Sequence, residues 1–140
     1  KIGPDKGRIF ADFRTEIQMV YTGVAVSNRF LAERPMTVER FMRGLAKGRE
    51  FARRFKEPTV AIMAKRNPLP VEALSLDYDI ALGSMTDEGW ISDETLNEEV
   101  KTRAELVNAT KVPDVGTIFD YTLIKKAYTD LKKERWTPTR

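Results

Sequence analysis

The chain has 140 residues, of which 41% are hydrophobic and 32% charged, and its formal net charge is +3. This length suits a single domain, and the hydrophobic share is enough for a core and too high for a disordered chain. The sequence contains no cysteine and no histidine, which excludes thiol nucleophiles, Ser-His-Asp triads, disulfides and the usual zinc sites. We therefore expect a protein that is not an enzyme and that carries no metal and no cofactor.

Carboxylates are the main catalytic groups left in such a sequence. Acidic pairs occur at Asp77 and Asp79 and at Asp87 and Glu88. Neither pair lies in a phosphate-binding loop or a recognisable metal-binding loop. An enzyme that uses Asp77, Asp79 or Asp87 stays open as an alternative, although the sequence identifies no substrate pocket for it.

The start of the chain predicts export or truncation. No apolar run approaches the ~20 residues needed to span a bilayer, and no basic and apolar leader opens the sequence. The chain begins at Lys1 rather than at a methionine. We therefore expect that residues upstream of Lys1 have been removed, as happens when an exported protein loses its leader or when a chain is a fragment.

Two stretches near the N-terminus have the composition of strands. Residues 8–11 predict a brief strand, and residues 17–27 predict a longer one that is rich in β-branched and aromatic residues. The nearly continuous apolar run of the longer stretch is typical of a strand buried on both faces of a mostly parallel sheet. Gly23 within it indicates a kink or a close backbone approach. A lone buried strand cannot satisfy its own backbone hydrogen bonds, so we expect its partner strands upstream of Lys1 or in another chain.

The remainder of the sequence predicts helices. Residues 28–34 predict a short helical turn, and longer helices are expected near 37–56, 58–66, 70–82, 92–108 and 120–135. Each longer segment has apolar residues at helical spacing; in the first they are Val38, Phe41, Met42, Leu45, Ala52 and Phe55. Thr37, Ser92 and Asp120 stand where they would cap helix starts. The predicted fold class is α/β, with one or two strands followed by about five helices.

Four segments, in this order, resemble parts of a known family. Residues 21–45 read YTGVAVSNRFLAERPMTVERFMRGL, which predicts a strand, a short helix and a Pro-led helix. The later segments read EPTVAIMAK at 57–65, DEGWIS at 87–92 and FDYTLIKKAY at 119–128. The set resembles the periplasmic solute-binding proteins of ABC importers for taurine, alkanesulfonates, nitrate and thiamine precursors. The resemblance covers nearly the whole chain from residue 17, but the chain is about half the length of that family.

The resemblance implies the C-terminal, helix-rich part of a type II periplasmic-binding-protein fold, as a single partial domain over residues 1–140. Residues 1–16 would end the second lobe or form the hinge, and residues 17–140 would complete the first lobe with a strand and helices. Such proteins capture a small molecule between two lobes and deliver it to the membrane subunits of a permease. The implied location is periplasmic, or extracytoplasmic with a lipid anchor, and no nucleic-acid partner is expected.

Ligand-binding residues are predicted only from this scheme. Tyr21, Thr22 and Gly23 lie in the stretch that would return near the hinge and the cleft, where they would contact the ligand. The alternative is that Tyr21 packs in the core of the sheet and that Gly23 allows close packing. Trp90 likewise either stacks on a ligand or covers the start of a helix.

Charge is spread unevenly along the chain. Residues 1–66 hold 15 basic and 7 acidic residues, whereas residues 67–140 hold 9 basic and 14 acidic residues. A second function therefore stays open, a helical nucleic-acid-binding or regulatory module, whose basic residues would alternatively form only a solvated helix face. These residues are Arg40, Arg43, Lys47, Arg49, Arg53 and Arg54.

The isolated chain is also predicted to form a homodimer or a larger assembly. The edge of the strand at 17–27 would be unpaired, and the apolar faces of the helices near 37–56 and 120–135 would lack the sheet that should cover them. A two-fold contact would let each copy cover the other.

Overall fold

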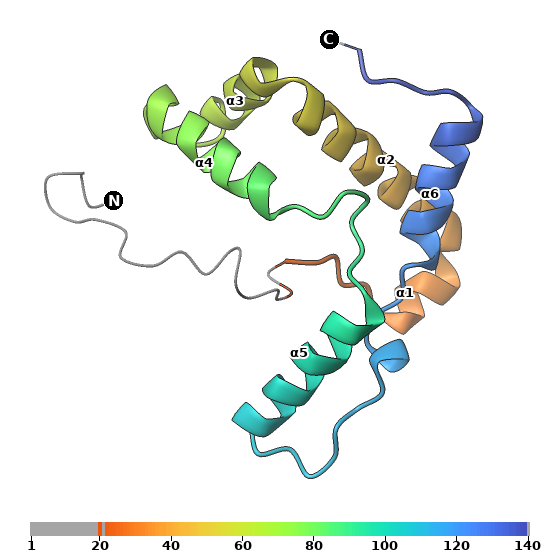
Figure 1. Ribbon diagram of the computed structural model, residues 1–140. Helices are drawn as coiled ribbons and strands as arrows, with labels where there is room; N and C mark the ends of the chain where they lie inside the picture. The colour runs from red at the N-terminus through yellow and green to blue at the C-terminus, as the bar shows by residue number, and fades with distance from the viewer. Residues whose placement is uncertain (1–19, 21, 140) are drawn as a thin grey trace, which may run out of the picture.

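The computed structural model describes residues 20 and 22–139, and this part of the chain is all-helical (Figure 1). It contains six α-helices and one short 3-10 helix. Their bounds are α1 Asn28–Glu33, α2 Pro35–Arg54, α3 Lys56–Ala64, α4 Val71–Ser84, α5 Asp93–Leu106, η1 Val115–Thr117 and α6 Thr122–Lys133.

The α/β fold predicted from the sequence is wrong, because the described residues contain no strand. Residues 22–27 have no regular secondary structure, while residues 17–19 and 21 of the predicted strand, and all of 8–11, lie outside the described residues. Val24 and Val26 are 50% and 40% exposed. A high content of β-branched residues favours a strand only where a pleated, half-buried surface receives them. The described part of the chain provides no such surface, and residues 22–27 lead instead into α1, which Ser27 caps by accepting a hydrogen bond from the Phe30 amide.

The centre of the fold is the packing of α2 against α6. Pro35 stands in the first turn of α2, where a missing N–H costs nothing because that N–H has no helical partner. The buried residues of this pair form one cluster of Ala46, Ile124, Ala127, Tyr128 and Leu131. Trp90 and Trp136 pack against the cluster from the loops. The apolar face of α6 is therefore covered by α2, and not by a β-sheet as the sequence predicted.

The positions of the five predicted helices agree with α2 to α6, with ends that differ by a few residues. Ser92 caps α5 as expected, since its hydroxyl accepts from the Thr95 amide. Thr37 does not cap, because α2 begins two residues earlier at Pro35. Asp120 lies one residue before the N-cap of α6, Tyr121, and its carboxylate accepts from the Thr122 amide at 2.8 Å. Hydrogen bonds from the Thr122 hydroxyl and from its amide lower the pKa of Asp120.

Two arms extend from the α2–α6 centre (Figure 1). The first arm is the α3–α4 pair, which buries Val60, Leu74 and Tyr78 in a second cluster. The second arm is α5, which contacts η1. The α3–α4 arm and the α2 helix that carries it enclose the candidate site described next.

Candidate functional site

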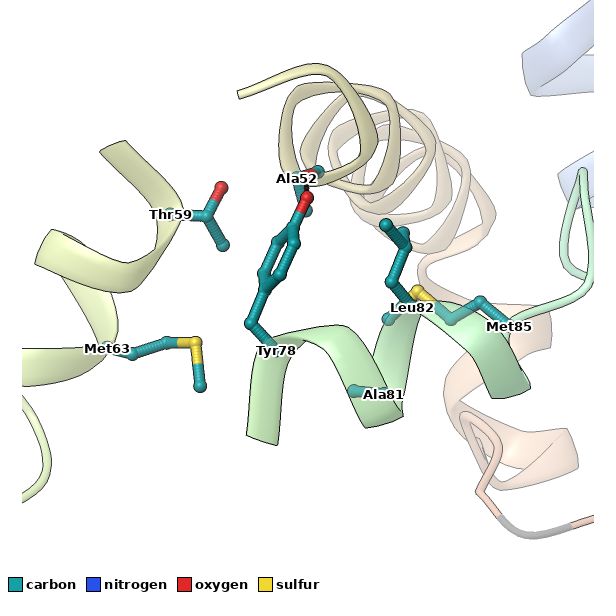
Figure 2. A pocket seen from close by; sticks show the side chains of 7 residues that line it. All are labelled: Ala52, Thr59, Met63, Tyr78, Ala81, Leu82 and Met85. Carbon is teal, nitrogen blue, oxygen red and sulfur yellow. Dashed lines mark hydrogen bonds between the residues drawn. The ribbon is translucent and has the colours of Figure 1, made fainter. Parts of the chain in front are cut away.

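A small hollow lies between the C-terminal half of α2 and the α3–α4 arm (Figure 2). It measures about 100 Å³ and is lined by Ala52, Thr59, Met63, Tyr78, Ala81, Leu82 and Met85. The packing of α3 on α4 through their apolar residues brings these side chains together. Figure 2 shows the Tyr78 ring standing between the α3 and α2 sides of the hollow.

The polar groups of the hollow already have partners within the chain. The Tyr78 hydroxyl donates to the Ala52 carbonyl, and the Thr59 hydroxyl donates to the Phe55 carbonyl at 2.7 Å. The remaining walls are apolar. Pockets for drug-sized ligands measure roughly 300–1,000 Å³, so this hollow fits an alkyl or aryl side chain rather than a whole solute. It presents no group that could act as an acid, a base or a nucleophile at neutral pH.

A second hollow of about 230 Å³ lies between α5 and η1. Its polar side chains include Asn97, which donates to the Asp93 carbonyl at 2.8 Å, and Asp114, which accepts from the Gly116 amide at 2.9 Å. Burial raises the pKa of the Tyr121 phenol at the edge of this hollow. These groups stabilise a helix start and a turn, and their arrangement gives no sign of a bound ligand.

The densest polar contacts of the described residues join α2 to the loop after α4. Arg49 donates to the Thr86 carbonyl at 2.6 Å, and Arg53 donates to the Asp87 carboxylate at 2.8 Å. Lys132 of α6 pairs with Glu88 in the same loop. Two nearby side-chain atoms, Arg49 Nε and the Tyr128 hydroxyl, are buried, and no hydrogen bond of standard geometry reaches either of them within the part of the chain that the structure describes. These contacts fasten the 86–89 loop to the α2–α6 centre.

The basic residues of α2 are largely engaged within the chain. Besides Arg49 and Arg53, Arg43 forms an ion pair with Glu134, which raises the pKa of Arg43. Lys47 lies over the Trp136 ring and Arg54 over the Phe55 ring. These contacts engage five of the six basic residues that the nucleic-acid alternative would use, and Arg40 and Arg54 are exposed.

The acidic pairs lie opposite cations as well. Asp79 accepts from Lys56 at 2.7 Å, Asp87 from Arg53, and Glu88 from Lys132. These ion pairs hold the three carboxylates against cations of α3, α2 and α6. Within residues 20 and 22–139, no group of three or more acidic side chains could hold a metal ion.

Of the residues predicted to bind a ligand, Thr22 and Gly23 are exposed and line neither hollow. Tyr21 lies outside the described residues. A Cβ added at Gly23 would meet no atom of the described residues within 4 Å. Trp90 covers the Tyr128 ring in an edge contact at 6.1 Å and carries Lys125 over its own ring. Trp90 therefore packs on α6 beside the central cluster, and not over the start of a helix.

Sequence reasoning missed both the α2–α3–α4 hollow and the arginine contacts to the 86–89 loop. The spacing of Arg49 and Arg53 was a usable signal, because residues four apart share one helix face. Their partners at 86 and 87 stand more than thirty positions away in the sequence, and no local pattern connects the two regions.

No family model, no curated protein and no solved structure matches the chain. Among the described helices, none is both long and apolar enough to cross a membrane.

Proposed function

We propose that this chain is a helical part of the solute-binding component of an ABC importer. In this role it does not catalyse a reaction. It helps to hold a small molecule between lobes outside the cytoplasmic membrane, in the periplasm or on a lipid anchor, and the complex presents that molecule to the permease subunits.

The order of the helices is the observation that carries this proposal. The four segments that resemble the family coincide with α1 and the start of α2, with α3, with the turn and cap before α5, and with the start of α6. The resemblance comes from the sequence, and the helical parts that it predicts agree with the structure. The predicted strand is absent from residues 22–27, so the support is restricted to the helices.

The chemistry of the described surface agrees with a binding role better than with catalysis. Asp79, Asp87 and Glu88 form ion pairs with cations of the chain, and the hollow in Figure 2 is apolar and small. A hollow of about 100 Å³ is too small to enclose a solute by itself. The ligand would therefore bind in a cleft that this chain forms together with another lobe.

A thermal-shift screen of small molecules against the full-length protein that contains this chain tests the proposal. We expect sulfonates, carboxylates or pyrimidines to raise its melting temperature without being consumed, because a ligand that binds only the native state stabilises it. Neutral sugars provide the matched negative set. A protein that no solute stabilises, and that binds DNA with a steep dependence on salt, would contradict the proposal and favour the nucleic-acid alternative.

A further inference from the structure

Helix α4 has apolar residues on two opposite sides, and the described residues cover only one of these sides. Leu74 and Tyr78 are buried against α3. On the opposite side, Leu76 is 59% exposed and Ile80 39% exposed, and Gly83 continues the same side of the helix. A helix that is apolar all round is normally buried all round. The outer α4 face, defined as Glu72, Leu76, Ile80 and Gly83, therefore lacks a partner within the described residues.

Helix α2 has a similar uncovered side. We define the outer α2 face as Thr37, Arg40, Phe41, Gly44 and Gly48, all of which are exposed. Phe41 is 55% exposed, and a Cβ added at either glycine would meet nothing within 4 Å. A glycine inside a helix costs roughly 1 kcal/mol relative to alanine. No contact made by the described residues requires this cost at Gly44 or Gly48, whereas the close approach of another helix would.

The two outer faces have opposite charge. The charged residue of the outer α4 face is Glu72, which is exposed. The charged residue of the outer α2 face is Arg40, which is also exposed. Two copies of the α4 face would bring acidic residues together, which disfavours an α4–α4 contact. An α2 face against an α4 face pairs apolar with apolar and basic with acidic.

We propose that two copies of this chain associate through these faces, with the outer α2 face of each copy against the outer α4 face of the other. A two-fold axis makes the contact reciprocal, so that both faces of both copies are covered and the assembly closes at two chains. Phe41 of one copy then packs against Leu76 and Ile80 of its partner, and the α2 glycines let the backbones approach. This inference goes beyond the proposed function, because solute binding neither requires nor forbids it.

Two charge-reversal variants of the 140-residue chain, measured separately and then mixed, test this arrangement. In Arg40→Glu both faces are acidic, and in Glu72→Lys both faces are basic. Each variant alone should be a monomer by light scattering or sedimentation at micromolar concentration, with its dissociation constant raised roughly tenfold or more by like charges. An equimolar mixture should form a heterodimer again, because each acidic face then meets a basic one.

Matched controls separate this effect from net charge and from misfolding. Lys101→Glu and Glu98→Lys change the same charges on the exposed surface of α5, away from both faces, and should leave association unchanged. Circular dichroism should show the same helix content in all four variants. The inference is overturned if the unaltered chain is monomeric, which would leave the two faces for another lobe or another protein. It is also overturned if both reversals still dimerise alone, or if the mixture stays monomeric.

Discussion

The α2–α6 pair and the α3–α4 pair are both packings of two helices, but their apolar residues are arranged differently. In α2 and α6 the apolar residues that pack between the two helices lie on one side of each, and ion pairs such as Lys126 with Glu39 cross the edge of the contact. In α4 the apolar residues lie on both sides, and only Leu74 and Tyr78 are covered. The contact between α2 and α6 covers the apolar face of α6, whereas the contact between α3 and α4 leaves the outer α4 face uncovered by the described residues, as the outer α2 face also is.

This difference shows that an exposed apolar stripe on a helix can indicate a surface that binds a partner. One buried stripe with polar flanks is what a helix needs when it packs on a single neighbour. A second apolar stripe adds nothing to folding unless something covers it. The outer α4 face therefore indicates an interface, whether another copy or another lobe covers it.

The largest expected effect comes from truncating the closed pair. Leu131 of α6 is 4% exposed and lies in the central cluster, so Leu131→Ala should cost about 2–5 kcal/mol in the free energy of unfolding. The same truncation on the outer α4 face, Leu76→Ala, should change it by less than about 0.5 kcal/mol in the dilute chain. Urea unfolding measures both, and equal losses at the two positions would break the comparison.

A smaller effect is expected where α4 reaches back to α2. Tyr78→Phe removes the hydroxyl that donates to the Ala52 carbonyl, which should cost about 0.5–1.5 kcal/mol. Amide hydrogen exchange should become faster in α3 and α4 and stay almost unchanged in α6. An equal effect on α6 would mean that the two pairs unfold as one unit.

Replacing a glycine on the outer α2 face should raise the free energy of unfolding, whereas the substitutions above lower it. Gly48→Ala should stabilise the dilute chain by about 0.5–1 kcal/mol, because alanine favours the helix and its Cβ meets open space. The same substitution should weaken the association of two copies. Gly89→Ala is the matched contrast. Gly89 has a φ of +88°, which strains any residue with a Cβ, so this substitution should destabilise the folded chain. Thermal unfolding at two protein concentrations distinguishes these results.

The smallest effect concerns pH and the edge of the α2–α6 contact. Hydrogen bonds to Asp130 and Glu39 raise the pKa of Lys126 from 10.5 to about 12. A raised pKa means that the native state binds this proton more tightly, so the stabilisation is present below pH 10.5 and lost as the pH rises through about 12. Over this window Lys126→Met should lose less stability than the unaltered chain. Identical alkaline unfolding curves would show that these exposed ion pairs contribute nothing measurable.

The sequence predicted the helices well because their signals are local. Apolar spacing, the Ser92 cap and the Pro35 start each act within a few residues, so they can be read without knowing the fold. The strand prediction failed for the converse reason. Val24 and Val26 resemble strand residues, but a strand depends on partners elsewhere in space, and residues 22–27 have none among the described residues.

The candidate site could be predicted only in part. Tyr21, Thr22 and Gly23 were predicted from a resemblance, and the two that the structure describes are exposed and do not line the hollow between α2, α3 and α4. The contacts of Arg49 and Arg53 with residues 86 and 87 depend on how α4 returns toward α2. Chain geometry of this kind is set by packing between distant segments, which helical periodicity does not specify.

Native-state hydrogen exchange of the α4 and α6 amides, measured over a range of protein concentrations, tests the central comparison most directly. We predict that the α6 amides exchange only through global unfolding at every concentration. The α4 amides should exchange faster in dilute solution and slow as the concentration rises and the outer α4 face becomes covered. Amides of α4 that are as protected as those of α6 in the most dilute sample, with no dependence on concentration, would contradict the account.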